Sequence, residues 1–327
     1  MEWYTDSRCI LLGSSDGLWL YDVDQPDKPL PLARLSGGAI NDIAVNPIDS
    51  MIAFSVNEQP IVYLLNTDGT KSILQANGQA ITGISFSNDG NWIAIASSDI
   101  GDIGSKFDAR VQIWDLSDKK QIAFMKSDTG AIREMFFTPD NHYLLTDGVL
   151  SGYIGDHIEY WDTATASRVW DYNELWTSFG HKSADDPFPL LVLKIAMKGH
   201  NIAFGGLYGY MDYDEYYGHA IQSWDAELRE PKFEIILSRR GSGEPEVGVS
   251  NLTFNSDGSV LVSSSSNGIV QFWKMTDGSE IDKFEIGQHE VDQIALSPND
   301  RFLAILSDGE VRIWDVEKQS EYVVLPT

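Results

Sequence analysis

Apolar and polar residues alternate over short stretches along nearly the whole chain. Runs such as Ile81–Phe86 and Val291–Leu296 have a period of two, and each is followed by an apolar run, Trp92–Ala96 and Phe302–Leu306 respectively. Such alternation, rich in β-branched and aromatic residues, predicts strands. No stretch shows the 3.6-residue period of an amphipathic helix. The chain is therefore predicted to be all-β.

Turn residues separate the two runs of each pair. Pro fixes φ near −65°, and Asn, Asp and Gly tolerate positive φ, so these residues favour hairpin turns. The predicted turns are Asn46–Asp49, Ser87–Gly90, Thr138–Asn141, Asn255–Gly258 and Ser297–Asp300, with Thr5–Arg8 and Met197–His200 in the same place in two further units. Each unit thus begins with a strand a, a turn and a strand b.

A shared ending marks a third strand, c, in each unit. Four of these segments end in Trp-Asp, at Trp114-Asp115, Trp161-Asp162, Trp224-Asp225 and Trp314-Asp315. Weaker forms end at Tyr21-Asp22, Leu65-Asn66 and Trp273-Lys274, so that the last residues are 22, 66, 115, 162, 225, 274 and 315. The steps between them run from 41 to 63 residues, which indicates a repeat of about 40–45 residues with insertions. A less regular strand d completes each unit.

With these endings in phase with seven turns, the chain resembles a WD40-repeat protein. The resemblance implies a seven-bladed β-propeller of four-stranded antiparallel blades, formed by residues 1–327 as a single domain. The blades are expected near residues 1–37, 38–78, 79–130, 131–187, 188–246, 247–287 and 288–327. Met1–Tyr4 supplies a strand a and Glu321–Leu325 a strand d, so no strand exchange between the first and last blade is expected.

The resemblance also implies a hydrogen-bond network within each blade. In the family pattern the Trp of strand c pairs with a Ser or Thr of strand b, an Asp of the b–c turn and a His before strand a. Ser263 and Trp273 match this pattern in the sixth unit. In the seventh unit His289, Asp308 and Trp314 match, and Ala304 stands where the Ser is expected.

Charge narrows the choice of partners. The 49 acidic and 23 basic residues give a formal net charge of −26, which repels nucleic-acid backbones and anionic lipid heads. We expect one or more protein partners, with basic surfaces favoured, and neither nucleic acid nor membrane. Solubility, or life in a salty cell, explains the charge equally well. Cys9, the single cysteine, lies in a predicted buried strand, and no secretory signal is visible, so a cytoplasmic location is expected.

Long connections are predicted at one end of the third to fifth blades. Because strands alternate in direction, the b–c and d–a connections share one face and the a–b and c–d turns share the other. The long b–c connections are Ser97–Arg110, Thr146–His157 and Gly205–Ala220, and the long d–a connections are Trp176–Pro189 and Ser238–Glu246. Long loops on a rigid scaffold often carry function.

The b–c connection of the fifth blade, Gly205–Ala220, is a candidate docking site. It holds five tyrosines and three acids between positions 207 and 217, and tyrosine gives a large contact area at low entropic cost. The predicted anchors are Tyr208, Tyr210, Tyr213, Tyr216, Trp176 and Phe179, and the predicted steering charges are Asp212, Asp214 and Glu215. The alternative is that these aromatic residues pack their own loops against the scaffold and contact no partner.

No catalytic, cofactor-binding or metal-binding residues are predicted. The three acids of the tyrosine-rich loop lack the spacing of a calcium-binding EF-hand, and no metalloprotease, phosphate-loop or nucleophile-elbow motif is present. The predicted function is a non-catalytic scaffold that docks partners on the b–c and d–a face of blades 3 to 5. Two alternatives stay open: a propeller enzyme or calcium-binding protein that uses the central channel, and a permanent structural subunit of a larger complex.

Overall fold

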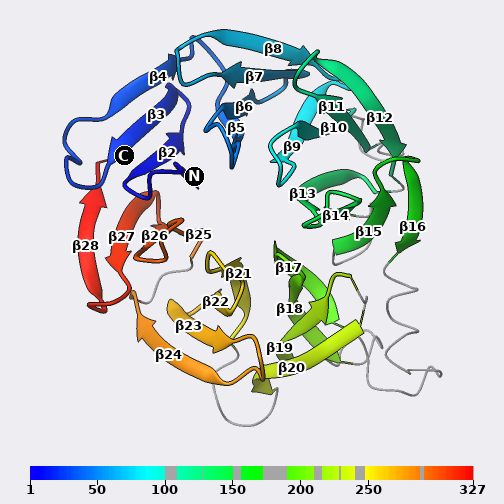
Figure 1. Ribbon diagram of the computed structural model, residues 1–327. Coiled ribbons are helices and arrows are strands. Elements are labelled where there is room, and N and C mark those ends of the chain that lie inside the picture. Colours follow the sequence, from blue (N-terminus) through cyan, green and yellow to red (C-terminus); the bar gives the residue numbers. More distant parts are fainter. Residues whose placement is uncertain are drawn as a thin grey trace. The chain divides into compact units, whose positions relative to one another are not determined.

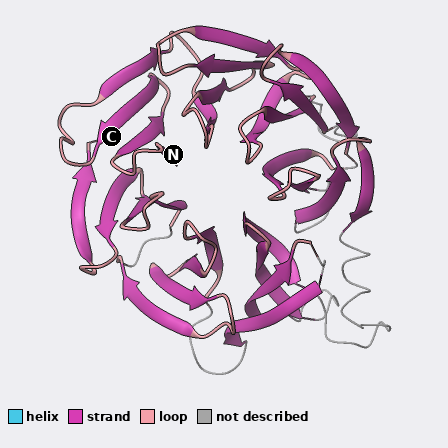
Figure 2. Cartoon of the chain, in the orientation of Figure 1, coloured by secondary structure: helices cyan, strands magenta, loops and turns pink. Residues whose placement is uncertain are grey.

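The computed structural model describes residues 1–99, 109–127, 129–149, 156–171, 190–209, 216–227, 230–239, 247–287 and 291–326. Every helix or strand element in these ranges is a β-strand (Figure 2). The strands pair, always antiparallel, into seven four-stranded sheets, which we call blades. The chain divides into two compact units, Met1–Asp171 and Tyr172–Thr327.

The first unit holds blades 1 to 4 (Figure 1). Their strands are β1 (Glu2–Trp3), β2 (Cys9–Gly13), β3 (Gly17–Asp22), β4 (Leu30–Arg34); β5 (Ile40–Val45), β6 (Ile52–Val56), β7 (Ile61–Leu65), β8 (Lys71–Gln75); β9 (Ala80–Phe86), β10 (Trp92–Ser98), β11 (Arg110–Asp115), β12 (Lys120–Lys126); and β13 (Ala131–Phe137), β14 (Tyr143–Val149), β15 (Asp156–Asp162), β16 (Ser167–Asp171).

The second unit holds blades 5 to 7. Their strands are β17 (Leu190–Lys198), β18 (Asn201–Gly209), β19 (Tyr216–Asp225), β20 (Glu230–Arg239); β21 (Val249–Phe254), β22 (Val260–Ser265), β23 (Ile269–Lys274), β24 (Glu280–Glu285); and β25 (Gln293–Leu296), β26 (Phe302–Ser307), β27 (Glu310–Asp315), β28 (Ser320–Leu325).

The predicted fold class is confirmed. Each described blade takes its four strands, a to d, from one continuous stretch of chain, including the short first strand β1 and the last strand β28. No strand is exchanged between the first and last blade, because β1 pairs with β2 and β28 pairs with β27.

Apolar side chains fill the space between neighbouring blades of a unit. Leu11 and Leu18 of blade 1 pack with Phe54 and Val56 of blade 2, and Ile113 of blade 3 packs in one cluster with blade 4. Blades 5 and 6, and blades 6 and 7, share similar clusters. Burial of such side chains contributes about 1.5–3 kcal/mol each, so the alternating pattern of the strands becomes the contact between blades.

Strand a carries a one-residue bulge in blades 2 to 6. The extra residues are Asn41, Thr82, Arg133, Leu193 and Ser250. A bulge changes the direction of the side chains at and beside it. In blades 2 and 6, an asparagine side chain at or beside the bulge bonds to the next blade. The amide of Asn41 donates to the Ile81 carbonyl at 2.8 Å, and the amide of Asn251 donates to the Val291 carbonyl at 3.1 Å.

Candidate functional site

The structure places two of the predicted anchors on strands. Tyr208 is the second-last residue of β18 and Tyr216 is the first residue of β19, so both belong to the last described ladder pairs of these strands. The other predicted residues, Tyr210, Asp212, Tyr213, Asp214, Glu215, Trp176 and Phe179, lie outside the described residues.

The β18–β19 hairpin is longer than its counterparts. The Trp near the end of strand c serves as a common reference, since Trp224 pairs with Ile202 as Trp273 pairs with Leu261. Beyond that pair blade 5 continues for seven residues on β18 and eight on β19, whereas blade 6 continues for four on each strand. At about 3.3 Å per residue, the extra three residues extend the sheet by roughly 10 Å at its b–c end.

Three of the predicted long connections are shorter than expected. The fourth-blade connection predicted at 146–157 is strand up to Val149 and again from Asp156. The fifth-blade connection predicted at 205–220 is strand up to Gly209 and from Tyr216, and β20 continues through Ser238 to Arg239. Gly-rich and Tyr-rich stretches lack strict alternation and therefore predict loops, but ladder pairing continues as far as Val149 and Gly209 and is present again from Asp156 and Tyr216.

Blade 3 closes its b–c end with an ion pair. The Arg110 guanidinium, at the start of β11, contacts the Asp99 carboxylate, just after β10, at 2.5 and 3.2 Å. Nearby, the Ser97 hydroxyl donates to the Asn77 carbonyl, and the Asn77 N–H donates to the side-chain carbonyl of Gln112 at 2.6 Å. These contacts tie the d–a connection before the blade to its strands b and c.

Blade 4 has a buried charged group in the corresponding place. Glu159 is fully buried; its carboxylate accepts from the Ser127 hydroxyl at 2.5 Å and from the Arg168 guanidinium at 2.9 Å. The Thr129 hydroxyl lies 2.7 Å from that of Ser127. Gly148 leaves room for this group, since a Cβ there would lie 2.6 Å from the Thr129 hydroxyl. The base of this connection is therefore held by a satisfied polar network.

One contact of this network recurs in other blades, and the sequence analysis missed it. A side chain two residues before the Trp of strand c bonds to the side chain seven residues after that Trp, on strand d. The pairs are Gln112–Gln121 at 2.5 Å, Glu159–Arg168 at 2.9 Å, Gln271–Glu280 at 2.7 Å and Arg312–Glu321 at 3.5 Å. Gln222 and Glu234 make the equivalent contact at 3.0 Å in blade 5. In four of these blades the two polar residues lie nine positions apart, and this spacing is the sequence signal that could have revealed the contact.

At the other end of the blades, the a–b turns are hydrogen-bonded to one another. These turn-to-turn bonds join every pair of neighbouring blades within a unit. They link Thr5 to Ser50 (2.6 Å), Asn46 to Gly90 (2.9 Å), Asn88 to Thr138 (2.8 Å), Asn201 to Gly258 (2.8 Å) and Ser256 to Asp300 (2.7 Å). The polar groups of these short turns are therefore engaged in holding blades together.

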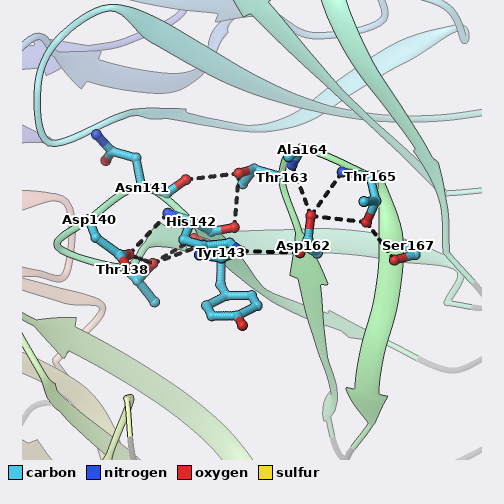
Figure 3. Close-up of polar contacts among 10 residues, drawn as sticks. All are labelled: Thr138, Asp140, Asn141, His142, Tyr143, Asp162, Thr163, Ala164, Thr165 and Ser167. Carbon is cyan, nitrogen blue, oxygen red and sulfur yellow. Dashed lines mark hydrogen bonds and ion pairs between the residues drawn. The ribbon is translucent and has the colours of Figure 1, made fainter.

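The Asp that follows the Trp organises the c–d turn at the same end. In blade 4, shown in Figure 3, the Asp162 carboxylate accepts from the N–H groups of Ala164 and Thr165 at 3.0 and 2.8 Å, and His142 lies 3.2 Å from it. The Thr165 N–H is the largest reason why the pKa of Asp162 is lowered. Asp115 accepts likewise from Ser117, whose hydroxyl contributes most to lowering the pKa of Asp115. These carboxylates have structural partners.

The expected Trp hydrogen bond forms in some blades. The indole N–H of Trp273 donates to the Ser263 hydroxyl at 2.8 Å, as predicted, and that of Trp161 donates to the Thr146 hydroxyl at 3.1 Å. The assignment of Ala304 to the Ser position was wrong by one residue. The b–c turn of blade 7 is one residue shorter than that of blade 6, so Ile305 takes the position, and the Trp314 N–H finds no partner among the described residues.

The described ranges contain neither a metal-binding group nor a membrane-spanning helix. No group of three or more His, Cys, Asp or Glu side chains there is arranged to hold a metal ion. Nor does that part of the chain contain a helix of the length and apolarity needed to cross a membrane. Cys9 is buried as predicted, and burial is the main cause that raises the pKa of its thiol to about 12, so this thiol is a packing residue.

Three stretches of the chain match a known family. Residues 70–115, 237–274 and 281–315 match the model of the WD domain, G-beta repeat. The chain therefore contains WD40-type repeats at three positions and folds into seven four-stranded blades.

Two curated proteins are similar over part of their length. Telomerase protein component 1 of Mus musculus is 22% identical over 209 residues, which is 64% of this chain and 7% of the mouse protein. Target of rapamycin complex subunit wat1 of Schizosaccharomyces pombe is 29% identical over 107 residues, which is 31% of this chain and 32% of the yeast protein. The matched region thus spans under a third of either relative.

Proposed function

We propose that this chain is a non-catalytic protein-interaction scaffold that docks partner proteins through the b–c and d–a connections of blades 3, 4 and 5. The elongated β18–β19 hairpin carries the proposal. It extends the b–c end of blade 5 by roughly 10 Å, and the backbone of Tyr208 and Tyr216 lies at the end of its paired strands. Tyrosines on a rigid support are favoured as anchors, because little entropy is lost when they bind.

Two further observations support the proposal. The buried Glu159 network and the Asp99–Arg110 pair hold the bases of two other connections on rigid strands, and binding loops are commonly presented in this way. At the opposite end the short turns bond to one another, which leaves fewer polar groups there for a partner.

The net charge of −26 favours partners with basic surfaces, because complementary charge speeds encounter. It disfavours nucleic acid and anionic membranes for the same reason. A cytoplasmic location is part of the proposal.

The test compares two clusters of substitutions in the full chain. Tyr208, Tyr210, Tyr213 and Tyr216 are changed together to Ser, and the control changes the exposed Ile48 and Ile73 to Ser. Truncating a central anchor costs about 2 kcal/mol or more of binding free energy. The amount of each partner recovered with the tyrosine variant, measured by affinity purification and quantitative mass spectrometry, should therefore fall about tenfold or more. A tyrosine variant that retains every partner of the wild type would refute the docking site.

A permanent subunit of a larger assembly is a second candidate, because one relative is named as a subunit of a complex. Light scattering on native material distinguishes the two. A fixed subunit stays in one high-mass species on dilution, whereas a transient scaffold appears at the 36.4 kDa mass of the chain.

A further inference from the structure

Two Asn-Gly pairs occur in the sequence, Asn77-Gly78 and Asn267-Gly268. In such a pair the backbone nitrogen of the glycine is able to attack the asparagine side chain, because glycine has no Cβ to hinder the approach. Asn77-Gly78 lies between β8 and β9, a d–a connection, and Asn267-Gly268 lies between β22 and β23, a b–c connection (Figure 1). The two pairs are thus alike in sequence and lie at corresponding ends of their blades, so their hydrogen bonds are directly comparable.

The reacting groups of Asn267-Gly268 are held in place. The Gly268 N–H donates to the Ser265 carbonyl at 3.0 Å, and the side-chain carbonyl of Asn267 accepts from the Ser265 hydroxyl at 2.5 Å. One bond restrains the nitrogen that would attack, and the other restrains the side chain that would be attacked. The reaction therefore requires that this turn first gives up both hydrogen bonds, which slows it.

The reacting groups of Asn77-Gly78 lack these restraints. Among the described residues no group accepts from the Gly78 N–H, and none bonds to the side-chain amide of Asn77. The amides on either side are engaged, since the Asn77 N–H donates to the Gln112 side chain at 2.6 Å and the Gln79 N–H donates to the Ser98 carbonyl at 3.1 Å. Asn77 is also exposed, so water reaches it.

We propose that Asn77 is a site of spontaneous deamidation, and that the turn at Asn267 is protected from the same reaction. The Gly78 nitrogen loses its proton to solvent base and forms a bond to Cγ of Asn77, while the bond from Cγ to Nδ2 breaks and ammonia leaves. Water then adds to either carbonyl of the resulting succinimide ring. The products are aspartate and isoaspartate at position 77, and each conversion adds a negative charge to the chain.

The isoaspartate product alters the contact between blades 2 and 3. Its main chain runs through Cβ and Cγ of residue 77, and the former backbone carbonyl becomes part of a free carboxylate. In the native chain that carbonyl accepts from the Ser97 hydroxyl of β10, and the N–H of the same residue donates to Gln112 of β11. The additional main-chain atom disturbs both bonds, so deamidation loosens the d–a connection from strands b and c of blade 3. This inference does not depend on the docking function proposed above.

The test follows both sites in the same folded chain during incubation at neutral pH. Peptide mapping by mass spectrometry, with fragmentation that separates isoaspartate from aspartate, gives the rate at each site. Synthetic peptides of residues 74–81 and 264–271 give the rate of each sequence without the fold. The ratio of folded to peptide rate should be at least roughly tenfold larger for Asn77 than for Asn267, because two hydrogen bonds must break at the second site.

Three variants assign the reaction to its residues. N77Q should abolish most of the isoaspartate that accumulates, since the longer side chain forms the corresponding ring much more slowly, and N267Q is the matched control that should leave it unchanged. S265A removes the hydroxyl that restrains Asn267 and should speed conversion at that site. After the same incubation, amide hydrogen exchange of residues 76–79 should rise in the wild type and stay constant in N77Q.

Equal folded-to-peptide ratios at the two sites, or faster conversion at Asn267, would show that the hydrogen bonds of the turns do not control the reaction. Absence of isoaspartate at position 77 of the folded chain, over a time in which the peptide of residues 74–81 converts fully, would also overturn the proposal. Conversion at Asn77 with no rise in hydrogen exchange would refute the predicted loosening of blades 2 and 3.

Discussion

Burial raises the pKa of Asp42 to about 6, although the N–H groups of Ile84 and Ile43 donate to its carboxylate at 2.7 and 2.8 Å. Ile84 belongs to β9, so the charge joins the first strands of two neighbouring blades. A raised carboxyl pKa means that the folded chain holds the proton more tightly than the unfolded chain. The resulting penalty is absent below the usual pKa of 3.8 and complete above about 6.

Replacing Asp42 with Asn should therefore change stability in a pH-dependent way. The free energy of unfolding of D42N, relative to the wild type, should rise between pH 4 and pH 7 by up to about 3 kcal/mol, since each pKa unit corresponds to about 1.4 kcal/mol. Asp42 keeps some solvent contact, so this value is an upper limit. Urea unfolding over that pH range measures the difference.

D115N is the matched control. The pKa of Asp115 is lowered from 3.8, so its contribution is complete above that value and is lost only below it. The difference between D115N and the wild type should therefore stay nearly constant from about pH 4 to pH 7. A difference between D42N and wild type that does not change with pH would contradict the assignment.

The strand-b partner of each strand-c Trp was predictable from the sequence in some blades only. Ser263 and Trp273 were paired correctly because the sixth unit keeps the common turn length. Ile305 was missed because one fewer turn residue shifts the strand-b position relative to Trp314, and only the register of the ladder shows this shift. Thr146 was missed as a partner of Trp161 because its strand was predicted as part of a loop.

At the scale of elements, the cross-strand pair between strands c and d differs in burial from blade to blade. Glu159 has no exposed side-chain surface and Arg168 is 34% exposed, whereas Arg312 and Glu321 are 39% and 43% exposed. The same contact should therefore have different energies, because a buried charge that loses its partner is costly and an exposed one is solvated.

R168M should destabilise the chain by about 3 kcal/mol, since it removes the guanidinium that pairs with the buried Glu159 carboxylate. R312M makes the same Arg-to-Met substitution in an exposed pair, and it should lower the free energy of unfolding by less than about 1 kcal/mol. Chemical unfolding of both variants checks this, and equal losses would show that burial does not control the pair.

Strand existence was predictable, but strand length was not. The period of two and the turn residues located every blade, including β1 and β28 at the two ends. The extensions of β18 and β19 were missed because Gly205, Gly206 and Gly209 interrupt the apolar pattern. Gly205 is needed there, since a Cβ at that position would lie 2.7 Å from the Val249 side chain of blade 6. Packing against a neighbour, rather than propensity, explains this residue.

At the scale of the whole molecule, a net charge of −26 should work against the folded state through self-repulsion. Raising NaCl from 0.02 to 0.3 M shortens the screening length from roughly 20 to about 6 Å. The midpoint of thermal unfolding at pH 7 should therefore rise by about 2 °C or more. Near the isoelectric point of about 4.4 the same salt should have little effect. A fall in the midpoint at pH 7 would mean that surface ion pairs outweigh the repulsion.

The sequence predicted the architecture, whereas the docking site stays a prediction. The blade count and the pairing of strands follow from a repeated local pattern, so errors in one blade do not alter the others. The tyrosine-rich site depends on side-chain positions within one insertion, for which the repeat offers no template. Of its predicted residues, the structure describes Tyr208 and Tyr216 as backbone positions at the end of a hairpin.

The continuity of each blade has a consequence for biosynthesis. A sheet whose four strands adjoin in the chain requires no distant segment for its ladder, so it can form once about 40 residues have left the ribosome. Contacts close in sequence also cost little chain entropy to close. Nascent chains would then expose one unfinished sheet at a time, with each completed sheet offering its apolar face to the next as it emerges.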